Sequence, residues 1–259
     1  MNARFAPPTA PPASHPSVHA PWSAWRLHFE RTAQRPLPEA GDLREQMPPA
    51  QARVVLEALA RFQIGECGEG RIAREIHRAG LPHTDDDYAA ALGLFIREEG
   101  RHARILASHI RGSGGQLLRD SWTRQVFSVG RRLAGPRTEL VALMAAEIVG
   151  IAFYAEAARR LPPGPLSSSL RQIAGDETAH LDFHVAFFAR QLRASPRFRP
   201  RFLALWMAAV GAGATLMVTD NRSALAALDI DPVALWRWQI RRAREIAGRV
   251  DAAAQVAPR

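Results

Sequence analysis

Two segments of the sequence place a glutamate and a histidine three residues apart on a predicted helix. They are REEGRH, which contains Glu99 and His102, and DETAH, which contains Glu177 and His180. Residues three apart lie on one face of a helix, so each pair can reach a single centre. Carboxylate oxygens and imidazole nitrogens are ligands for metals such as Fe and Mn. Both pairs are therefore candidate metal ligands.

Each pair interrupts an apolar helix face. In the second long helix, steps of three and four give Tyr88, Leu92, Phe95, Glu99, His102 and Leu106. The same stepping in the fourth long helix gives Leu170, Ile173, Glu177, His180, His184 and Phe187. Such a face packs toward the core of a protein. We therefore expect both pairs to be buried.

The other two long helices also carry acids on their apolar faces. The face of the third is Leu140, Leu143, Glu147, Gly150 and Tyr154. The face of the first is Val55, Leu59, Phe62, Glu66, Glu69, Ala73 and Ile76. Because the separation of Glu69 from Glu99 equals that of Glu147 from Glu177, the spacing favours two related helix pairs.

Several buried carboxylates at one level of a bundle need positive charge among them. An unpaired buried carboxylate costs several kcal/mol unless it is protonated, paired or bound to a cation. Two divalent ions would offset about four carboxylates, and neutral imidazoles would complete the coordination. Ligation by Glu and His without thiolate suits Fe or Mn better than structural zinc. The sequence predicts two Fe ions, with Mn as an alternative metal.

These motifs resemble those of the ferritin-like diiron-carboxylate superfamily. EEGRH (98–102) is similar to the second-helix motif of soluble acyl-carrier-protein desaturases, and DETAH (176–180) to their fourth-helix motif. FQIGE (62–66) is similar to the first-helix motif of rubrerythrins. The motifs span residues 66–184, roughly half of the chain. The resemblance implies a ferritin-like four-helix bundle, and we expect extra helices at both ends of it.

The resemblance also implies roles for individual residues. Glu99 and Glu177 are expected to bridge two metal ions, His102 and His180 to supply imidazole ligands, and Glu147 to be a terminal ligand. Each of these five residues matches a position of the superfamily's ligand pattern, in the same helix order.

The resemblance does not distinguish Glu66 from Glu69 on the first helix, and both are open as ligands. Rubrerythrins usually carry a rubredoxin-like cysteine site, which the single cysteine of this chain, Cys67, excludes. Cys67 is expected to be a small buried residue. Ferritins generally contain one Glu-x-x-His, so an iron-storage cage is a poor match.

Other polar residues near the motifs have expected supporting roles. His184 and Asp176 are expected to be hydrogen-bond partners of the ligands. Glu98 is expected to face away from the metals, and both Glu98 and Asp176 to pair with Arg101 or with another helix. Tyr154 is a weak candidate for a redox or proton-transfer residue, and a packing role is the alternative.

The breakers along the chain define helices, and sustained alternation typical of strands is absent, so the predicted class is all-α. The expected elements are an amphipathic element at 22–29, long helices at 49–78, 85–111, from AGPRT to 161 and at 166–193, a short piece at 120–133, and helices at 199–219 and 231–249. We expect one domain over 21–250, with the bundle at about 49–193, a disordered tail over 1–20 and a flexible tail over 251–259.

The composition indicates a globular protein. The chain has 259 residues, of which 47% are hydrophobic, and it can bury a sizeable core. All 34 basic residues are arginines, and the formal net charge is +9. These arginines are scattered and accompany no nucleic-acid motif, which favours coding bias over nucleic-acid binding. The single cysteine excludes an intrachain disulfide and fits a cytoplasmic protein.

Residues 202–219 (FLALWMAAVGAGATLMVT) contain no charged side chain. Their length approaches the roughly 20 residues that cross a bilayer. Gly211 and Gly213 lie within the segment, and Asp220 follows at once. We therefore favour a helix packed against the domain or against a second subunit, which leaves a homodimer open, over a membrane span.

The predicted function is an oxidoreductase of oxidase, hydroxylase or desaturase type, in which two metal ions activate O2 toward an unknown apolar substrate. Phe95, Ile151 and Phe187 are expected to surround the ligands. Because the chain has no Rossmann fingerprint and no iron–sulfur cysteines, an external electron donor is expected. The alternatives are a ferroxidase or iron-handling protein and a non-catalytic helical interaction module.

Overall fold

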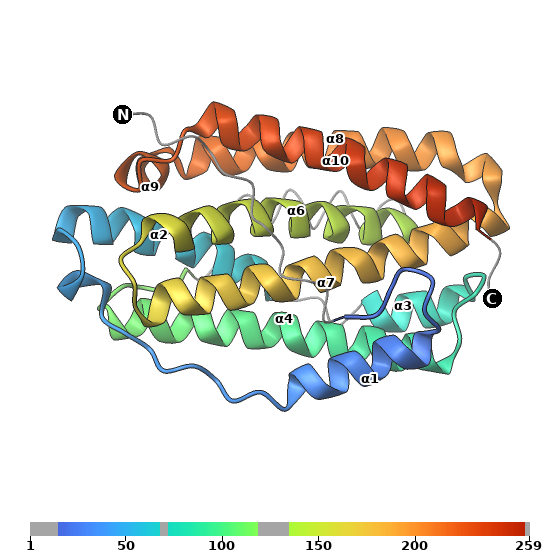
Figure 1. Ribbon diagram of the computed structural model, residues 1–259, viewed down its shortest axis with the longest axis horizontal. Coiled ribbons are helices and arrows are strands. Elements are labelled where there is room, and N and C mark those ends of the chain that lie inside the picture. The colour runs from blue at the N-terminus through green and yellow to red at the C-terminus, as the bar shows by residue number, and fades with distance from the viewer. Residues whose placement is uncertain (1–14, 68–71, 119–134, 257–259) are drawn as a thin grey trace.

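The structure, a computed structural model, describes residues 15–67, 72–118 and 135–256 (Figure 1). All regular secondary structure in these ranges is helical, which confirms the predicted class. The elements are α1 (Trp22–Ala33), η1 (Leu43–Glu45), α2 (Pro49–Gly65), α3 (Ile72–Ala79), α4 (Asp86–Gly112), α6 (Pro136–Arg160), α7 (Pro165–Ala194), η3 (Pro196–Phe198), α8 (Arg199–Asp220), α9 (Arg222–Ala227) and α10 (Pro232–Gln255).

The four helices that carry the predicted ligands form the centre of the molecule. Helix α2 packs on α4, and α6 packs extensively on α7. These match the two helix pairs that the spacing of the acids favoured. Figure 1 shows all four running along the long axis, and the further contact of α4 with α7 joins the pairs into a bundle.

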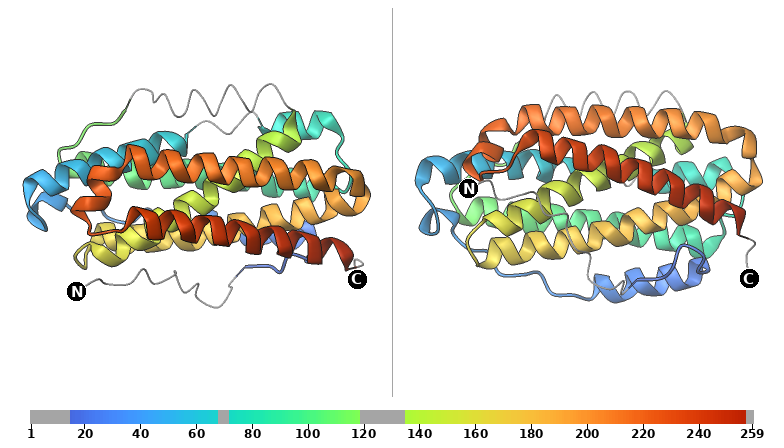
Figure 2. Two further views of the ribbon diagram at one scale, coloured as in Figure 1. Left: turned by 90° about the horizontal axis from the view of Figure 1, so that it is seen from above. Right: turned by 45° about the horizontal axis from the view of Figure 1, so that its top comes forward.

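Further helices cover two sides of this bundle. Helix α1 packs on α4, whereas α8 and α10 pack on each other, α8 against α6 and α10 against α7. In Figure 1 the α8–α10 layer lies above the bundle and α1 lies below it, and Figure 2 shows the same layer from two other directions. The predicted additions at both ends of the bundle are therefore present.

Local sequence explains where the bundle helices begin. The Asp85 carboxylate caps α4 by accepting the backbone N–H of Tyr88 at 2.8 Å, and two further acids lie in the first turn. Helices α6 and α7 begin with Pro136 and Pro165 at the first helical position, where the missing N–H costs nothing.

The predicted first long helix, 49–78, is wrong in one respect. Helix α2 ends at Gly65 and α3 begins at Ile72. Glu66 caps α2, and its N–H donates to Phe62 O at 3.1 Å. Gly65, Gly68 and Gly70 lie in this stretch, and each glycine disfavours helix by about 1 kcal/mol relative to alanine. The apolar pattern of the sequence continues past Gly65, but α2 ends there.

Three other expectations are modified at the edges of the domain. Residues 15–20, predicted as part of a disordered tail, are held by Arg190, which donates to Val18 O at 3.3 Å and to Ala20 O at 2.7 Å. Helix α10 continues to Gln255, into the predicted flexible tail, and α9 was not predicted. The predicted helical piece at 120–133 lies outside the described residues.

Helices α6 and α8 are each long and apolar enough to cross a membrane by length and composition alone. The apolar window of α6 is 78% buried, and that helix carries part of the candidate site, whereas the window over 196–220 is 33% buried. Helix α8 nevertheless packs on α6 and α10, and its residues Phe202, Trp206 and Val210 are fully buried. The expected packing of this segment against the domain is observed.

Candidate metal centre

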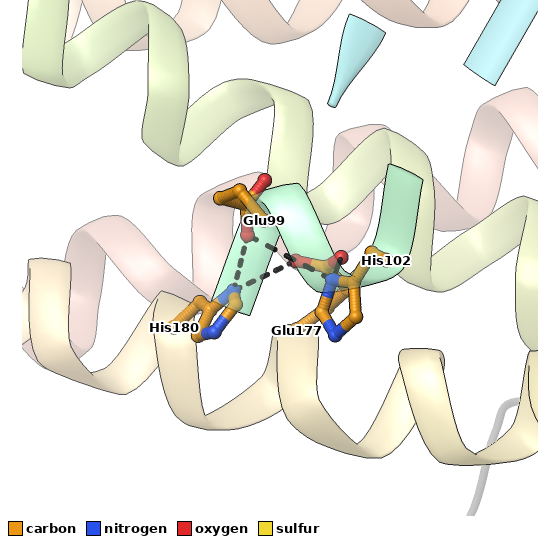
Figure 3. Close-up of side chains that lie close together, drawn as sticks. All are labelled: Glu99, His102, Glu177 and His180. Carbon is orange, nitrogen blue, oxygen red and sulfur yellow. Dashed lines mark hydrogen bonds and ion pairs between the residues drawn. The ribbon is translucent and has the colours of Figure 1, made fainter. Parts of the chain in front are cut away.

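The residues of the two Glu–His pairs meet between α4 and α7 (Figure 3). One ligand atom from each of Glu99, His102, Glu177 and His180 lies within 4.8 Å of the others, and all four side chains are buried. His180 Nδ1 lies 2.8 Å from Glu99 Oε1 and 3.1 Å from Glu177 Oε2. His102 Nδ1 lies 3.0 Å from Glu177 Oε1. Two pairs separate in sequence thus share one centre.

Several of these buried atoms lack a hydrogen-bond partner in the described part of the chain. They are Glu99 Oε1, His102 Nδ1 and Glu177 Oε1. Each lies near another polar atom of the cluster, but not in hydrogen-bonding geometry. A buried polar atom without a partner costs about 1–3 kcal/mol. Because all of them carry lone pairs directed to a common centre, this donor set fits metal cations.

Glu147 reaches the cluster from α6, on the side of His180. Its Oε2 atom lies 3.8 Å from His180 Nδ1, and its Oε1 atom lies 3.7 Å from His184 Nε2. The latter distance is too long for the hydrogen bond expected of His184. His184 is fully buried, and burial together with the nearby His180 lowers its pKa to about 3, so its ring is neutral at pH 7.

Glu66 reaches the cluster from the end of α2. It is half-buried and accepts a hydrogen bond from the buried Tyr154 hydroxyl at 2.5 Å. Burial and the charges of Glu99 and Glu177 raise the pKa of Glu66 well above its ordinary value, and His102 opposes this rise. The charge of His102 acts on Glu66, whereas Glu147 lies near His180. The other first-helix candidate, Glu69, lies outside the described residues.

The outer nitrogens of the two histidines contact carboxylates of the opposite motif. Glu98 Oε2 lies 3.1 Å from His180 Nε2, and Asp176 Oδ2 lies 3.3 Å from His102 Nε2. Of the two partners expected for these acids, another helix is the one observed. Arg101 instead donates to the backbone oxygen of Pro36 at 2.6 Å. The acids hold the rings with Nδ1 directed toward the centre.

Charges within the cluster shift the pKa values of its members in opposite directions. Burial alone would lower the pKa of His102 and His180, but the surrounding carboxylates, among them Glu177, raise both pKa values well above the ordinary value. Burial and the nearby acids, with Glu177 first, raise the pKa of Glu147 well above its ordinary value. The acids therefore need positive charge, which protons on the histidines or metal ions can supply.

A cavity of about 210 Å³ adjoins the candidate ligands. Five carboxylates contribute to its wall: Asp220 and the four acids Glu66, Glu99, Glu147 and Glu177. Apolar residues of α6 and α8 form much of the rest, including Leu143, Val149, Leu216 and Met217. The sequence did not identify α8 as part of this wall, because an uncharged helix gives no signal for which cavity it lines. A mostly apolar cavity beside convergent polar groups is typical of a binding site for a small molecule.

One expectation about a neighbouring residue differs from the structure. Cys67, expected to be buried, is exposed because α2 ends before it, and its thiol donates to Gln63 O at 3.4 Å. Phe95 packs edge-on against the ring of His180, with ring centroids 4.6 Å apart, as expected of a residue that surrounds the ligands. Ile151 and Phe187 are buried in the core and are not among the residues that line the cavity.

No family model and no curated protein sequence matches the chain. Solved structures of R2-like ligand-binding oxidases do match in fold. A variant with an anaerobically reconstituted Mn/Fe cofactor has a TM-score of 0.67 at 15% identity, covering 89% of this chain and 93% of that chain. A structure with an aerobically reconstituted metal cofactor, after photoconversion, has a TM-score of 0.64 at 16% identity with the same coverage. The predicted ferritin-like fold is confirmed.

Proposed function

We propose that this protein is a dinuclear-metal oxidase that holds two Fe ions, or one Mn and one Fe ion, and oxidises a small apolar substrate with O2. The observation that carries the proposal is the buried cluster of Glu99, His102, Glu177 and His180, whose unpartnered donor atoms converge beside an apolar cavity. The fold shared with oxidases whose structures contain Mn/Fe cofactors supports it.

We assign the proposed ligands to two positions. One position would have His180 with the nearby Glu147, and the other would have His102 with Glu66, on whose pKa His102 acts. Glu99 and Glu177 lie near both histidines and would bridge the two positions. Glu69, which lies outside the described residues, remains a proposed additional ligand.

When bound, the metal pair supplies electrons for the reduction of O2 and so provides the oxidant. The protein's own residues orient the ligands and exclude water. Glu98 and Asp176 accept from the outer nitrogens of the histidines and so leave Nδ1 of each ring available as a donor to metal. Tyr154 fixes the carboxylate of Glu66. The apolar wall contributed by α6 and α8 would bind the substrate next to the carboxylates.

The protein's reaction requires electrons from elsewhere. The chain contains one cysteine and no dinucleotide-binding fingerprint, so an external reductase would supply them. We propose that the protein reacts with O2 and an apolar organic substrate and receives electrons from this donor.

Metal loading followed by exposure to O2 tests the proposal. Protein freed of metal with a chelator is loaded with Fe(II) without oxygen, quantified, and then followed by its optical spectrum and O2 consumption. We expect about two ions per chain and a rapid spectral change. The double substitution Glu99→Ala/Glu177→Ala should abolish both. Glu57→Ala, at an exposed acid of α2 that pairs with Arg53, is the matched control and should abolish neither.

The outcomes separate the alternatives. Absence of bound metal would identify a helical interaction module and overturn the proposal. Oxidation of many Fe(II) equivalents, with mineral retained by the protein, would instead identify an iron-handling protein. Stoichiometric oxidation without retained mineral supports an oxidase.

A further inference from the structure

The two carboxylates behind the ligand histidines differ in their own partners. Asp176 Oδ1 accepts from Arg35 Nη1 at 2.6 Å, while its other oxygen contacts His102. Glu98 contacts His180 through Oε2, but its Oε1 atom is buried and has no hydrogen-bond partner among the described residues. The two histidines are therefore supported by carboxylates in unequal electrostatic environments.

Other charged groups nearby do not remove this difference. Arg101 is buried and interacts electrostatically with both Asp176 and Glu98, so it acts on the two pairs together. His28 is close enough to Glu98 to interact with it, but burial lowers the pKa of His28 to about 4. His28 is therefore neutral at pH 7 and brings no charge to Glu98. Among the described residues, Arg35 is the cation that contacts Asp176 and not Glu98.

The connection between α1 and α2 holds Arg35 in place. Residues 34–48 connect α1 to α2 along the outside of the bundle (Figure 1). The backbone oxygen of Pro36, next to Arg35, accepts from Arg101 at 2.6 Å. Further along, Gly41 N donates to His109 Nδ1 at 3.3 Å, and Leu43 N donates to Ser113 Oγ at 2.9 Å. The segment is thus held against α4 directly after the residue that contacts Asp176, and again further along at Gly41 and Leu43.

A carboxylate that accepts an imidazole N–H makes the other ring nitrogen a stronger donor to metal. A guanidinium bound to the same carboxylate offsets part of its charge and reduces this effect. Glu98 acts on His180 without such an offset, whereas Asp176 acts on His102 with it. We propose that Arg35 makes the two metal positions unequal, so that the position of His180 binds a divalent ion more tightly than the position of His102.

This inference rests on the proposed dinuclear centre and concerns the affinities within it. Mn(II) alone is a suitable probe, because the EPR signal of free Mn(II) gives both binding steps in a titration without O2. We expect two steps whose dissociation constants differ by about 10-fold or more, in the range that partners of metal ligands produce. His180→Ala should remove the tighter step, and His102→Ala the weaker one.

Two substitutions should each reduce the difference between the two dissociation constants, one by tightening the weaker step and the other by weakening the tighter step. Arg35→Gln removes the positive charge that offsets the Asp176 carboxylate. It should tighten the weaker step and leave the tighter step nearly unchanged. Glu98→Gln removes the uncompensated carboxylate and should weaken the tighter step. The side chain of Arg35 is 39% exposed, so its replacement can be accommodated, and circular dichroism verifies the fold.

Arg199→Gln is the matched control. Arg199 is 54% exposed and pairs with Asp251 at 2.7 Å, far along the chain from the centre, and its loss removes the same charge. It should leave both steps unchanged. Two equal steps in the unmodified protein, a weaker step that does not tighten in Arg35→Gln, or an equal shift in Arg199→Gln would each overturn the inference. Failure to bind any Mn(II) would instead overturn the dinuclear centre itself, so the two failures are distinguishable.

Discussion

Glu98 Oε2 lies 3.1 Å from the Nε2 atom of His180, a residue of the opposite helix. The reciprocal contact joins Asp176 Oδ2 to His102 Nε2 at 3.3 Å. Each motif therefore contributes a histidine to the centre and a carboxylate that orients the other motif's histidine. This crossed support ties α4 to α7 at the level of the candidate ligands.

Metal removal is expected to destabilise the protein. A ligand that binds only the folded state adds about 2.7 kcal/mol at 100 times its dissociation constant and about 4.1 kcal/mol at 1,000 times. Mn(II) at such concentrations should therefore raise the midpoint of thermal unfolding of metal-free protein. In Glu99→Ala/Glu177→Ala the rise should vanish, whereas Glu57→Ala should retain it. An equal rise in the double variant would place the binding outside the cluster.

The metal-free protein should lose stability as pH rises. His102 and His180 have raised pKa values, so their contribution is complete below the unfolded value of 6.5 and is lost as pH rises through the folded values. Glu66 and Glu147 also have raised pKa values, which lowers stability as pH rises above the unfolded value of 4.5. Thermal unfolding at pH 6 and pH 8.5, without metal, measures the difference.

Metal should reverse this dependence. Metal binding to the histidines requires their neutral form and releases protons, so affinity for Mn(II) should increase with pH over the same range. Proton release can be measured by calorimetry in buffers of different ionisation enthalpy. A metal-free protein that gains stability between pH 6 and pH 8.5 would contradict the assigned directions.

Tyr154→Phe should weaken the position that contains Glu66. The substitution removes the 2.5 Å hydrogen bond and leaves the half-buried Glu66 carboxylate without this donor, which costs up to about 1–3 kcal/mol. The free energy of unfolding from urea denaturation should fall by this amount in metal-free protein. Tyr88→Phe is the matched control, because Tyr88 is equally buried and its hydroxyl has no hydrogen-bond partner among the described residues. Comparable losses in both variants would show that the Tyr154 contact has no special effect.

Filling the cavity should block an apolar ligand without disturbing the metals. Ala209 lines the cavity from α8, and Ala209→Phe would occupy part of its volume of about 210 Å³. Octanol, used as an apolar probe, should raise the unfolding midpoint of the unmodified protein but not of this variant. Ala208→Phe, at the preceding and exposed position of α8, should retain the rise in the unfolding midpoint. Equal responses of the two variants would show that octanol binds elsewhere.

The sequence predicted the inner part of the cluster because helix geometry fixes it. Glu99 and His102 must share a face whatever the tertiary structure, and the same holds for Glu177 and His180. The acid at Glu147 followed from the same periodicity. These positions needed only the correct assignment of three helices, which strong apolar patterns and terminal prolines or acids made clear.

Features that depend on how helices meet could not be predicted in this way. The pairing of Glu98 with His180 depends on the rotation and register of α4 against α7. The end of α2 at Gly65 depends on a balance between an apolar pattern that continues and glycines that disfavour it. The exposure of Cys67 follows from that end, and the choice of α8 as a cavity wall follows from packing between distant segments.

The end of α2 also has a consequence for the exchange of ions with solvent. Glu99, Glu147 and Glu177 project from the middle of long helices, where turning a carboxylate away requires the helix or its neighbours to move. Glu66 lies at the terminus of its helix and is half-buried, so it can turn once the single hydrogen bond from Tyr154 breaks. We therefore expect the His102 position to release its ion faster than the His180 position. The residence time of the ion, and not only its affinity, would then depend on where α2 ends.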